Sequence, residues 1–327
     1  MTLGPQSDLS SERFDISVCI STLRRPQRLA RLLESLRGLA GTDAYRLEIV
    51  IIDNDAAASA RPIVDACQED YPHPIRYGVE PRQNIALARN RTVQMARGTW
   101  VAFIDDDEVA ASNWLAAYWQ MQSQYPGDGY FGRVMPRLEQ ETAPAWLDQD
   151  VFFALPRFAT GTPMLGPSTY TTNALIRRCL FDAHPFDPSF KFGREDMELF
   201  SRMIDTGAQF YYCDEAVTTE YYPPERVCFR WLLKRHFRGG FLYTRIDRQR
   251  HPGFTQQLPG LIKALGGIGL FTLMVPFEVW RGSTYAVKRI LRLSLQVGHI
   301  WEFCHLSRFF ETLTFEEYQL RYRGRLS

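Results

Sequence analysis

In this sequence four consecutive carboxylates follow directly on a short apolar run, so they stand at the end of a predicted buried strand. The run extends from Trp100 to Ile104, and the acidic residues are Asp105, Asp106, Asp107 and Glu108. Neighbouring carboxylates raise each other's pKa unless a cation lies among them, and a hard divalent cation such as Mg²⁺ or Mn²⁺ is the usual partner. The same residues also fit a solvated acidic turn. The cluster alone does not decide between a metal site and a turn.

Predicted strands and helices alternate through the first hundred residues. Strands are indicated over residues 16–20, 47–52 and 100–104, and helices over residues 29–36 and 85–96. This alternation predicts an α/β fold with a mostly parallel sheet and helices on its faces. In such sheets ligands bind beyond the carboxyl ends of the strands. Asp53 and Asp55 follow the second predicted strand, so we expect both at the same rim as the carboxylates after Ile104.

Changes in composition divide the chain into three parts. Residues 1–14 are polar and predict a flexible tail, and residues 15–225 contain the α/β pattern of a catalytic domain. Residues 226–327 form a helical extension, which starts with a basic stretch from Arg226 to Arg250 and continues with an uncharged run from Ala264 to Phe277. Because the run is short for a membrane span, we expect the extension to dock on an anionic membrane without crossing it.

The bulk properties exclude few partners. A length of 327 residues suffices for one large α/β domain or two smaller ones, and a formal net charge of +1 favours no class of partner. The cysteines form no C-x-x-C pair, which is typical of reduced thiols in the cytoplasm. The N-terminus lacks the basic start and apolar core of a signal peptide. We therefore expect a cytoplasmic protein that is peripheral to the inner face of the cell membrane.

Short motifs occur along roughly residues 15–240 in an order and spacing that are specific together, although each motif is weak alone. They are residues 18–25, 51–55, 84–90, 103–108, 172–174, 193–196 and 220–226. On these residues the chain resembles the inverting glycosyltransferases of family 2, which have the GT-A fold. Within that family it is similar to the bacterial enzymes that extend lipid-linked exopolysaccharide repeat units.

The resemblance implies a site for a UDP-sugar at the strand ends. Asp53 is expected to accept the uracil N3 proton and Arg89 to reach a uracil carbonyl. Asp107 is expected to coordinate the Mn²⁺ or Mg²⁺ that bridges the two phosphates. The sequence does not show whether Asp106 or Asp107 is the more important of the two. The other residues implied to bind the donor are Thr22, Arg24, Asp55, Asp105 and Asp106. Acidic residues after a strand are also common in ordinary turns.

The resemblance also implies a catalytic base near residue 196. Asp196 is expected to remove the proton of the acceptor hydroxyl, with Glu195 binding the acceptor or supporting the base. These two carboxylates open a helix predicted to end near Gly207, and the helix dipole favours acidic residues in a first turn without any catalytic role. The family more often has Gly-Gly before this pair, whereas Arg194 stands directly before it here.

Asn173 and Trp146 are expected near the acceptor and its sugar ring. Processive relatives carry Q-x-x-R-W, whereas Val227 takes the first place of that motif here, so transfer of a single sugar is favoured. We therefore predict a metal-dependent enzyme that moves one sugar from a UDP-sugar to a lipid-linked glycan in cell-surface polysaccharide synthesis. Its expected partners are this donor, this acceptor and an anionic membrane, with no nucleic acid, and a homo-oligomer is left open.

Two other functions remain open from the residues alone. A GT-A-like sugar nucleotidyltransferase usually carries a Gly-rich loop after the first strand, and residues 19–23 contain no glycine. A catalytically silent subunit that binds nucleotide-sugar in an assembly complex is expected to have lost Asp107 or Asp196. The chain retains both residues.

Overall fold

The computed structural model describes residues 13–190 and 193–304 and divides them into two compact units. The first unit runs to Met135 and resumes from Leu155 to Glu220, and the second contains Pro136–Ala154 and the chain from Tyr221 onward. The division at residue 220 lies near the boundary predicted at residue 225, but residues 136–154 group with the C-terminal helices. Most of the tail predicted at residues 1–14 lies outside the described residues, and so do Lys191 and Phe192.

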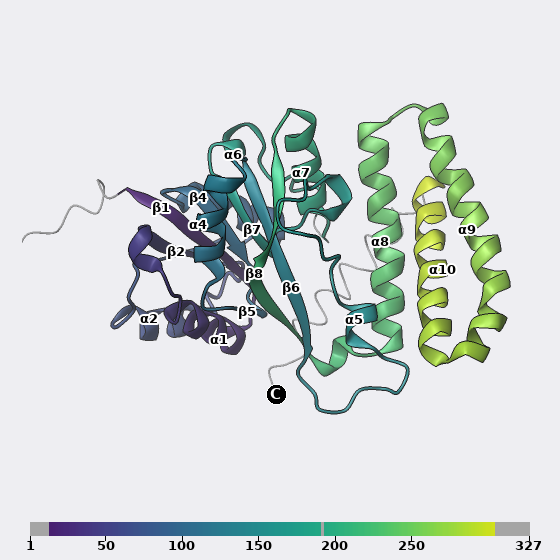
Figure 1. Ribbon diagram of the computed structural model, residues 1–327, viewed down its shortest axis with the longest axis horizontal. Helices are drawn as coiled ribbons and strands as arrows, with labels where there is room; N and C mark the ends of the chain where they lie inside the picture. Colours follow the sequence, from purple (N-terminus) through teal and green to yellow (C-terminus); the bar gives the residue numbers. More distant parts are fainter. Residues whose placement is uncertain (1–12, 191–192, 305–327) are drawn as a thin grey trace, which may run out of the picture. The chain divides into compact units, whose positions relative to one another are not determined.

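Within the described residues, eight strands form one mixed sheet in the order β3-β2-β1-β4-β7-β6-β8-β5 (Figure 1). The strands are β1 (Phe14–Thr22), β2 (Leu47–Asp53), β3 (Ile75–Val79), β4 (Gly98–Ile104), β5 (Glu108–Ala110), β6 (Gly129–Leu138), β7 (Asn173–Arg177) and β8 (Phe210–Tyr222). Strand β1 pairs in parallel with β2 and β4, and β2 with β3. Strand β7 runs antiparallel to β4 and β6, and β5 runs antiparallel to β8. The predicted α/β class is confirmed. The alternation of strands and helices in the sequence did not predict the antiparallel half of the sheet.

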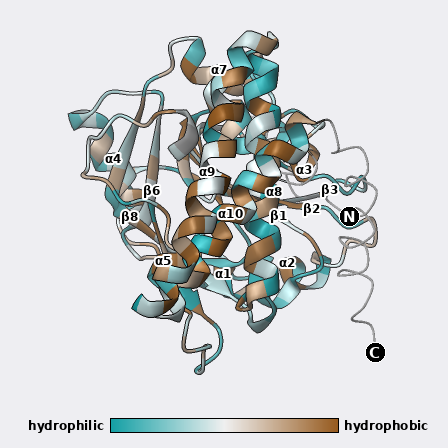
Figure 2. Cartoon of the chain, turned by 90° about the vertical axis from the view of Figure 1, so that its right-hand side faces the viewer, coloured by the Kyte–Doolittle hydropathy of each residue, from teal (hydrophilic) through white to brown (hydrophobic). Residues whose placement is uncertain are grey.

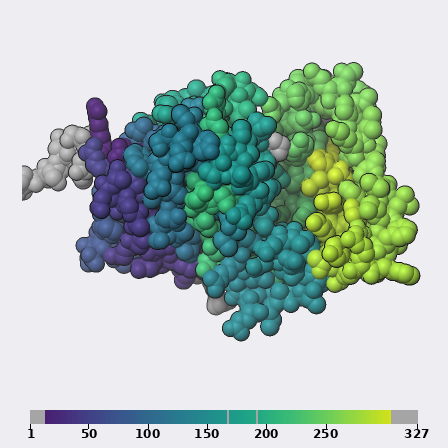
Figure 3. Space-filling model, viewed as in Figure 1, coloured from purple at the N-terminus to yellow at the C-terminus, as the bar shows by residue number. Residues whose placement is uncertain are grey.

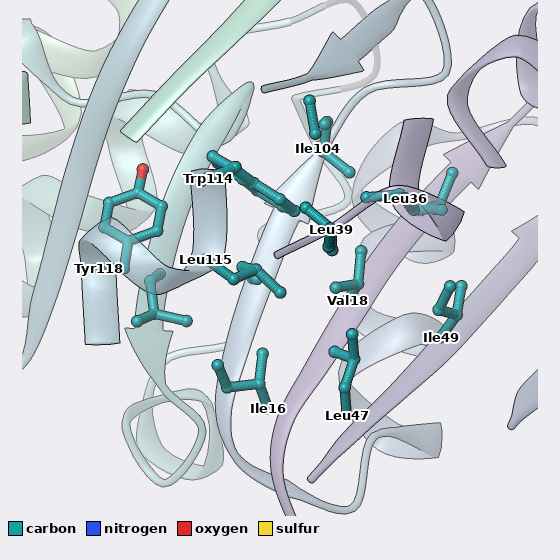
Figure 4. Close-up of a cluster of buried hydrophobic side chains, with 14 of the residues drawn as sticks. Ile16, Val18, Leu36, Leu39, Leu47, Ile49, Ile104, Trp114, Leu115 and Tyr118 are labelled. Carbon is teal, nitrogen blue, oxygen red and sulfur yellow. The ribbon is translucent and has the colours of Figure 1, made fainter. Parts of the chain in front are cut away.

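Helices cover both faces of the sheet, because successive side chains of each strand point to opposite faces. On one face Val18 and Ile49 pack with Leu36 and Trp114, which come from two helices (Figure 4). On the other face Phe103 packs in a second cluster with apolar residues of α3 and α7. The helices of this unit are α1 (Pro26–Arg37), α2 (Arg61–Gln68), α3 (Ile85–Met95), α4 (Trp114–Gln124), α6 (Leu180–Ala183) and α7 (Glu195–Asp205), with 3₁₀ turns at Thr42–Ala44 and Gly166–Ser168.

Local sequence determines where the two helices that carry candidate site residues begin. Asn84 caps α3, since its Oδ1 accepts the backbone N–H groups of Ala86 and Leu87 at 3.0 and 3.4 Å. Helix α7 starts at Glu195 after Arg194, whose φ of 69° lies in the left-handed region that favours glycine. Both helices therefore lie within a residue of their predicted starts, and Arg194 occupies a backbone conformation unusual for its type.

Long helices make up most of the second unit: α8 (Phe229–Arg250), α9 (Phe254–Arg281) and α10 (Ser283–Phe303), with the short α5 (Gln149–Phe152) and a 3₁₀ turn at Pro224–Arg226. Helix α8 corresponds to the predicted basic helix. Gly240 of α8 faces the α10 backbone and Gly298 of α10 faces the α8 backbone so closely that a Cβ on either would collide. Helix α9 is 28 residues long and continues through Pro276, so it extends beyond both ends of the predicted uncharged run.

Candidate active site

The acidic cluster forms a tight turn between β4 and β5. The N–H of Glu108 donates to the carbonyl of Asp105 at 3.1 Å, which closes the turn. The side chain of Asp105 is 36% exposed, whereas those of Asp106 and Asp107 are 5% and 7% exposed. The three carboxylates therefore lie at the carboxyl end of a parallel strand as predicted, and Asp105 is the most accessible of them.

Two arginines of the segment after β1 balance the charge of the inner carboxylates. Arg25 Nη1 lies 2.9 Å from Asp106 Oδ1 and 3.4 Å from Asp107 Oδ2, and Arg28 Nη1 lies 3.4 Å from the same Asp107 oxygen. The Thr22 hydroxyl donates to Asp106 Oδ2 at 2.7 Å. Burial raises the pKa of Asp106, Arg25 opposes this effect, and the Asp107 charge adds to it. Thr22 thus lies at the acidic cluster, and its predicted contact with the donor stays a prediction, while Arg25 and Arg28 were not predicted as site residues.

Arg89 links the acidic turn to the start of α7. Its guanidinium is buried, with Nη2 3.0 Å from Asp105 Oδ1 and Nη1 in an ion pair with Glu195 Oε1. Arg89 was predicted to reach a uracil carbonyl. In the structure its guanidinium is instead used between two carboxylates, because a buried charge needs a partner. The ion pairs bring a predicted donor residue, Asp105, and a predicted acceptor residue, Glu195, into one network.

Two consecutive threonines hold the candidate base and the accessible carboxylate. The backbone N–H of Thr171 donates to Asp196 Oδ2 at 3.4 Å, and the Thr172 hydroxyl donates to Asp105 Oδ2 at 3.1 Å. Asp196 is half-buried, unlike Glu195, which is buried. Within the described part of the chain, the buried atoms Thr171 Oγ1 and Glu195 Oε2 have no hydrogen-bond partner, which is rare in proteins. Two unsatisfied polar atoms therefore lie close to Asp196.

Glu195 has the electrostatic character of a group that titrates near neutral pH. Burial of its carboxyl raises the pKa of Glu195 from an ordinary 4.5 to about 7, while Arg89 lowers it and the Asp196 charge raises it. Desolvation outweighs the ion pair because the side chain is almost wholly removed from water. Two adjacent carboxylates thus lie in different environments, one buried against an arginine and one half-exposed.

Asp53 differs from its predicted role. It is fully buried, its Oδ1 accepts the N–H of Asp55 at 3.0 Å, and its Oδ2 accepts the Ala60 N–H at 2.7 Å and the Tyr77 hydroxyl at 3.0 Å. These contacts enclose the carboxylate, so Asp53 shapes the loop after β2 and does not face a base. Asp55, by contrast, pairs with the predicted Arg24, whose Nε and Nη2 each lie 3.1 Å from one of its oxygens. Hydrogen bonding from Arg24 lowers the pKa of Asp55.

Asn173 also differs from its predicted role as an acceptor contact. It begins β7 with no exposed surface, and its Nδ2 donates to the carbonyls of Arg133 and Ala216 at 3.0 and 2.8 Å. Its Oδ1 accepts the indole N–H of Trp114 at 2.7 Å and the Tyr118 hydroxyl at 2.5 Å. Every donor and acceptor of the amide is used inside the core. The residue therefore fixes β7 against α4 and leaves no group for an acceptor.

Trp146 belongs to the second unit, whereas the other predicted site residues belong to the first. Its ring packs edge-on against Phe152 and Phe229, with centroids 5.6 and 6.3 Å away, in the apolar cluster beneath α8. The contact of Trp146 with an acceptor sugar stays a prediction.

Glu108 carries a buried carboxyl whose surroundings disfavour its charged form. Burial raises the pKa of Glu108 well above its ordinary value, and the charges of Asp105, Glu220 and Asp107 add to this effect. Its backbone pairs directly with Glu220 across the β5–β8 ladder. The raised pKa reduces the negative charge that Glu108 adds beneath the turn.

Some residues of the site could have been found from the sequence, and others could not. Arg25 and Thr172 lie within the quoted motifs, and Arg28 stands three residues after Arg25, on the same face of a helix. Thr171 acts through its backbone N–H, which carries no signal in the residue type.

The carboxylates after β4 fit a divalent cation that is shared with a substrate. Within residues 13–190 and 193–304, no three His, Cys, Asp or Glu side chains form a ligand set of their own. Asp105 and Asp107 supply hard oxygen donors, and Mg²⁺ or Mn²⁺ commonly uses one or two carboxylates and completes its shell with phosphate oxygens. The donor set therefore suits the cation together with a phosphorylated ligand.

The parallel half of the sheet, with its carboxylates at the end of β4, has the architecture of the GT-A fold, and solved glycosyltransferase structures share it. The mannosyltransferase PcManGT from Pyrobaculum calidifontis, in complex with GDP-Man and Mn²⁺, matches with a TM-score of 0.59 at 13% identity, over 89% of this chain and 88% of that one. S. aureus TarS 1-349 in complex with UDP matches with a TM-score of 0.51 at 15% identity, over 86% of this chain and 90% of that one. At these identities the similarity shows the fold alone.

The family follows from the sequence match. The family model of glycosyl transferase family 2 matches residues 17–184, and the chain belongs to this family. The chain is 32% identical over 252 residues to the succinoglycan biosynthesis protein ExoM of Rhizobium meliloti (strain 1021), which covers 76% of this chain and 80% of that protein. Over 64 residues it is 39% identical to the uncharacterized glycosyltransferase YibD of Escherichia coli (strain K12), covering 19% of this chain and 18% of that protein.

Proposed function

We propose that this family 2 glycosyltransferase transfers a single sugar from a UDP-sugar, with inversion at the anomeric carbon, to a lipid-linked glycan. The observation that carries the proposal is the pair Thr171 and Thr172, adjacent residues that hold Asp196 and Asp105. A carboxylate on the donor side and a half-buried carboxylate suited to be a base therefore belong to one hydrogen-bonded network. The relative with the most extensive match described above, ExoM, is named for succinoglycan biosynthesis, which supports a role in exopolysaccharide assembly.

In the proposed reaction Asp196 removes the proton of the acceptor hydroxyl. The resulting oxygen forms a bond to the anomeric carbon from the side opposite the leaving group, and the bond between that carbon and the diphosphate oxygen breaks. The products are the extended glycan, UDP and a protonated Asp196, so the charges and atoms balance. One base and one displacement suffice for inversion, which agrees with a single half-exposed carboxylate at the start of α7.

Glu195 and Arg89 are proposed to position the parts of this site. The Arg89 guanidinium is fixed by Asp105 and Glu195, so the start of α7 and the acidic turn keep one relative placement. Preorganised charges of this kind lower the barrier because they need not rearrange during the reaction. Glu195 then supports Asp196 and does not itself contact the acceptor hydroxyl.

The residues that would hold a divalent cation are Asp105 and Asp107. When bound, Mn²⁺ or Mg²⁺ would stabilise the negative charge that develops on the diphosphate leaving group. Arg25 and Arg28 contribute positive charge beside Asp107. UDP is proposed as the nucleotide on the sequence motifs that resemble those of UDP-sugar enzymes; among proteins that share the fold, TarS is described with UDP and UDP-GlcNAc and PcManGT with GDP-Man.

A transfer assay with the full chain tests this function. Purified protein is incubated with labelled UDP-sugars, Mn²⁺ and a polyprenyl-diphosphate glycan extract, and labelled lipid and released UDP are both measured. We expect equal amounts of the two products in the wild type and in a control Asp182→Asn, which changes an exposed aspartate of α6. We expect no labelled lipid in Asp196→Asn. Formation of a nucleotide-sugar from a sugar phosphate would instead support the nucleotidyltransferase, and donor binding without any product would support the silent subunit.

A further inference from the structure

One face of α9 carries a continuous stripe of exposed apolar side chains. Ile262 is 60% exposed, Leu273 72%, Phe277 75% and Trp280 95%. These residues stand at helical spacing, so they lie along the same side of the helix. Figure 2 shows hydrophobic colouring along α9, and in Figure 3 its side chains, in yellow-green, reach the surface. An exposed apolar patch of this length marks an interaction surface.

The opposite side of α9 packs on α10 within the same unit. Ala264 and Glu278 are buried there, and Arg289 of α10 forms an ion pair with Glu278 at 2.5 Å. The Arg289 guanidinium also lies 5.4 Å from the centre of the Phe271 ring. Among residues 13–190 and 193–304, one face of α9 is occupied by its neighbour and the other is not, and the second is the more apolar.

The charges on α9 indicate what covers the exposed stripe. Lys263 and Arg281 are exposed, whereas the acidic residue of the helix, Glu278, is buried against two arginines of α9 and α10. The outer surface of α9 is thus apolar with positive charges and presents no carboxylate. This combination complements a surface of anionic headgroups over hydrocarbon. Trp280 beside Arg281 adds the aromatic and basic pair that is typical of a membrane–water interface.

Among the described residues, α9 is the one helix long and apolar enough to cross a membrane by length and composition. The packing of α10 argues for a different placement. Lys288 and Arg292 are exposed on α10, about one and a half to three turns from the chain reversal at Gly282. If α9 crossed the bilayer, these side chains would enter the hydrocarbon, where charges are expensive. A helix that lies in the interface buries the stripe and leaves α10 in water.

We propose that α9 lies in the plane of an anionic lipid bilayer, with the stripe containing Ile262, Leu273, Phe277 and Trp280 in the acyl boundary. The proposed membrane surface does not depend on the proposed glycosyl transfer. Docking on a membrane suits that reaction, however, since a lipid-linked acceptor cannot leave the bilayer. The occupant is the lipid surface itself.

Vesicle flotation with the full chain tests the proposal. The probes are detergent-free vesicles of phosphatidylcholine alone and of phosphatidylcholine mixed with phosphatidylglycerol. We expect the wild type to float with the mixed vesicles, and to bind more weakly at high salt and to phosphatidylcholine alone. Each large apolar side chain withdrawn from the stripe weakens partitioning by about tenfold or more, so Leu273→Glu with Phe277→Glu is expected to abolish flotation.

The matched control is Leu165→Glu with Met135→Glu, which places the same two charges on exposed apolar residues of the first unit. We expect this control to float like the wild type, and circular dichroism to show that all variants are folded. The proposal is overturned if the wild type does not float, or if the double variant of α9 floats equally well. It is also overturned if light scattering shows an oligomer that the double variant dissociates, or if the protein resists alkaline extraction from native membranes, as a spanning helix does.

Discussion

Replacing Glu195 with glutamine is expected to change how the stability of the protein depends on pH. The carboxyl of Glu195 has its pKa raised from 4.5 to about 7, chiefly by burial. The folded protein therefore binds this proton more tightly than the unfolded chain does. The group's contribution to stability is fully present below pH 4.5 and is lost as pH rises through about 7, because the buried carboxyl must then ionise.

The size of the effect follows from the pKa change. Each unit of pKa corresponds to about 1.36 kcal/mol, so the free energy of unfolding is expected to fall by about 3 kcal/mol across this interval. Glu195 is too buried for solvent to screen the effect strongly. The glutamine variant keeps a neutral hydrogen-bonding group beside Arg89 and has no proton to lose, so this fall is absent from it.

The assay is urea unfolding followed by circular dichroism, on wild type and variant, from about pH 4.5 to about pH 8. Other titrating groups are common to both proteins and cancel in the difference between their free energies of unfolding. We expect wild type to lose stability relative to Glu195→Gln as pH rises. A difference that stays constant would refute the role of burial. A difference of the opposite sign would mean that Arg89 outweighs desolvation and that the pKa of Glu195 is depressed.

Four further outcomes are expected. Asp196→Asn should lower kcat by about 10²–10⁴-fold with unchanged affinity for the UDP-sugar, and a parallel loss of donor binding in calorimetry would identify a structural carboxylate instead. Asp107→Ala should remove the Mn²⁺ dependence of UDP binding, measured by titration calorimetry with and without chelator; unchanged dependence would exclude this residue as a ligand. Asn173→Leu should destabilise the fold by about 1–3 kcal/mol for each buried partner left unpaired, including the Trp114 indole, while the acceptor KM of the folded enzyme stays the same. Arg194→Gly should be more stable to urea than Arg194→Ala by about 1 kcal/mol, since only glycine relieves the left-handed backbone, and equal stabilities would show that no strain is stored there.

The α/β class, the position of the acidic turn and the helix that starts at the Glu195–Asp196 pair could all be predicted from the sequence alone. The physical reason is that these features depend on local patterns. Apolar runs bounded by polar residues specify strands, and a strand that ends in carboxylates places them at the rim wherever the sheet is parallel. The short motifs also predicted the family, and the sequence comparisons confirm that prediction.

Which polar side chains face the site, and which form hydrogen bonds inside the protein, depends on the tertiary structure. Asp53 and Asn173 look like ligand-binding residues in the sequence, but their hydrogen bonds are completed by groups distant along the chain. Arg89 pairs with Glu195, which lies 106 residues away in the sequence, and no sequence pattern predicts that contact. Whether a polar group is available to a ligand depends on what the fold packs around it, because a buried polar atom is satisfied by whichever partner the packing brings near.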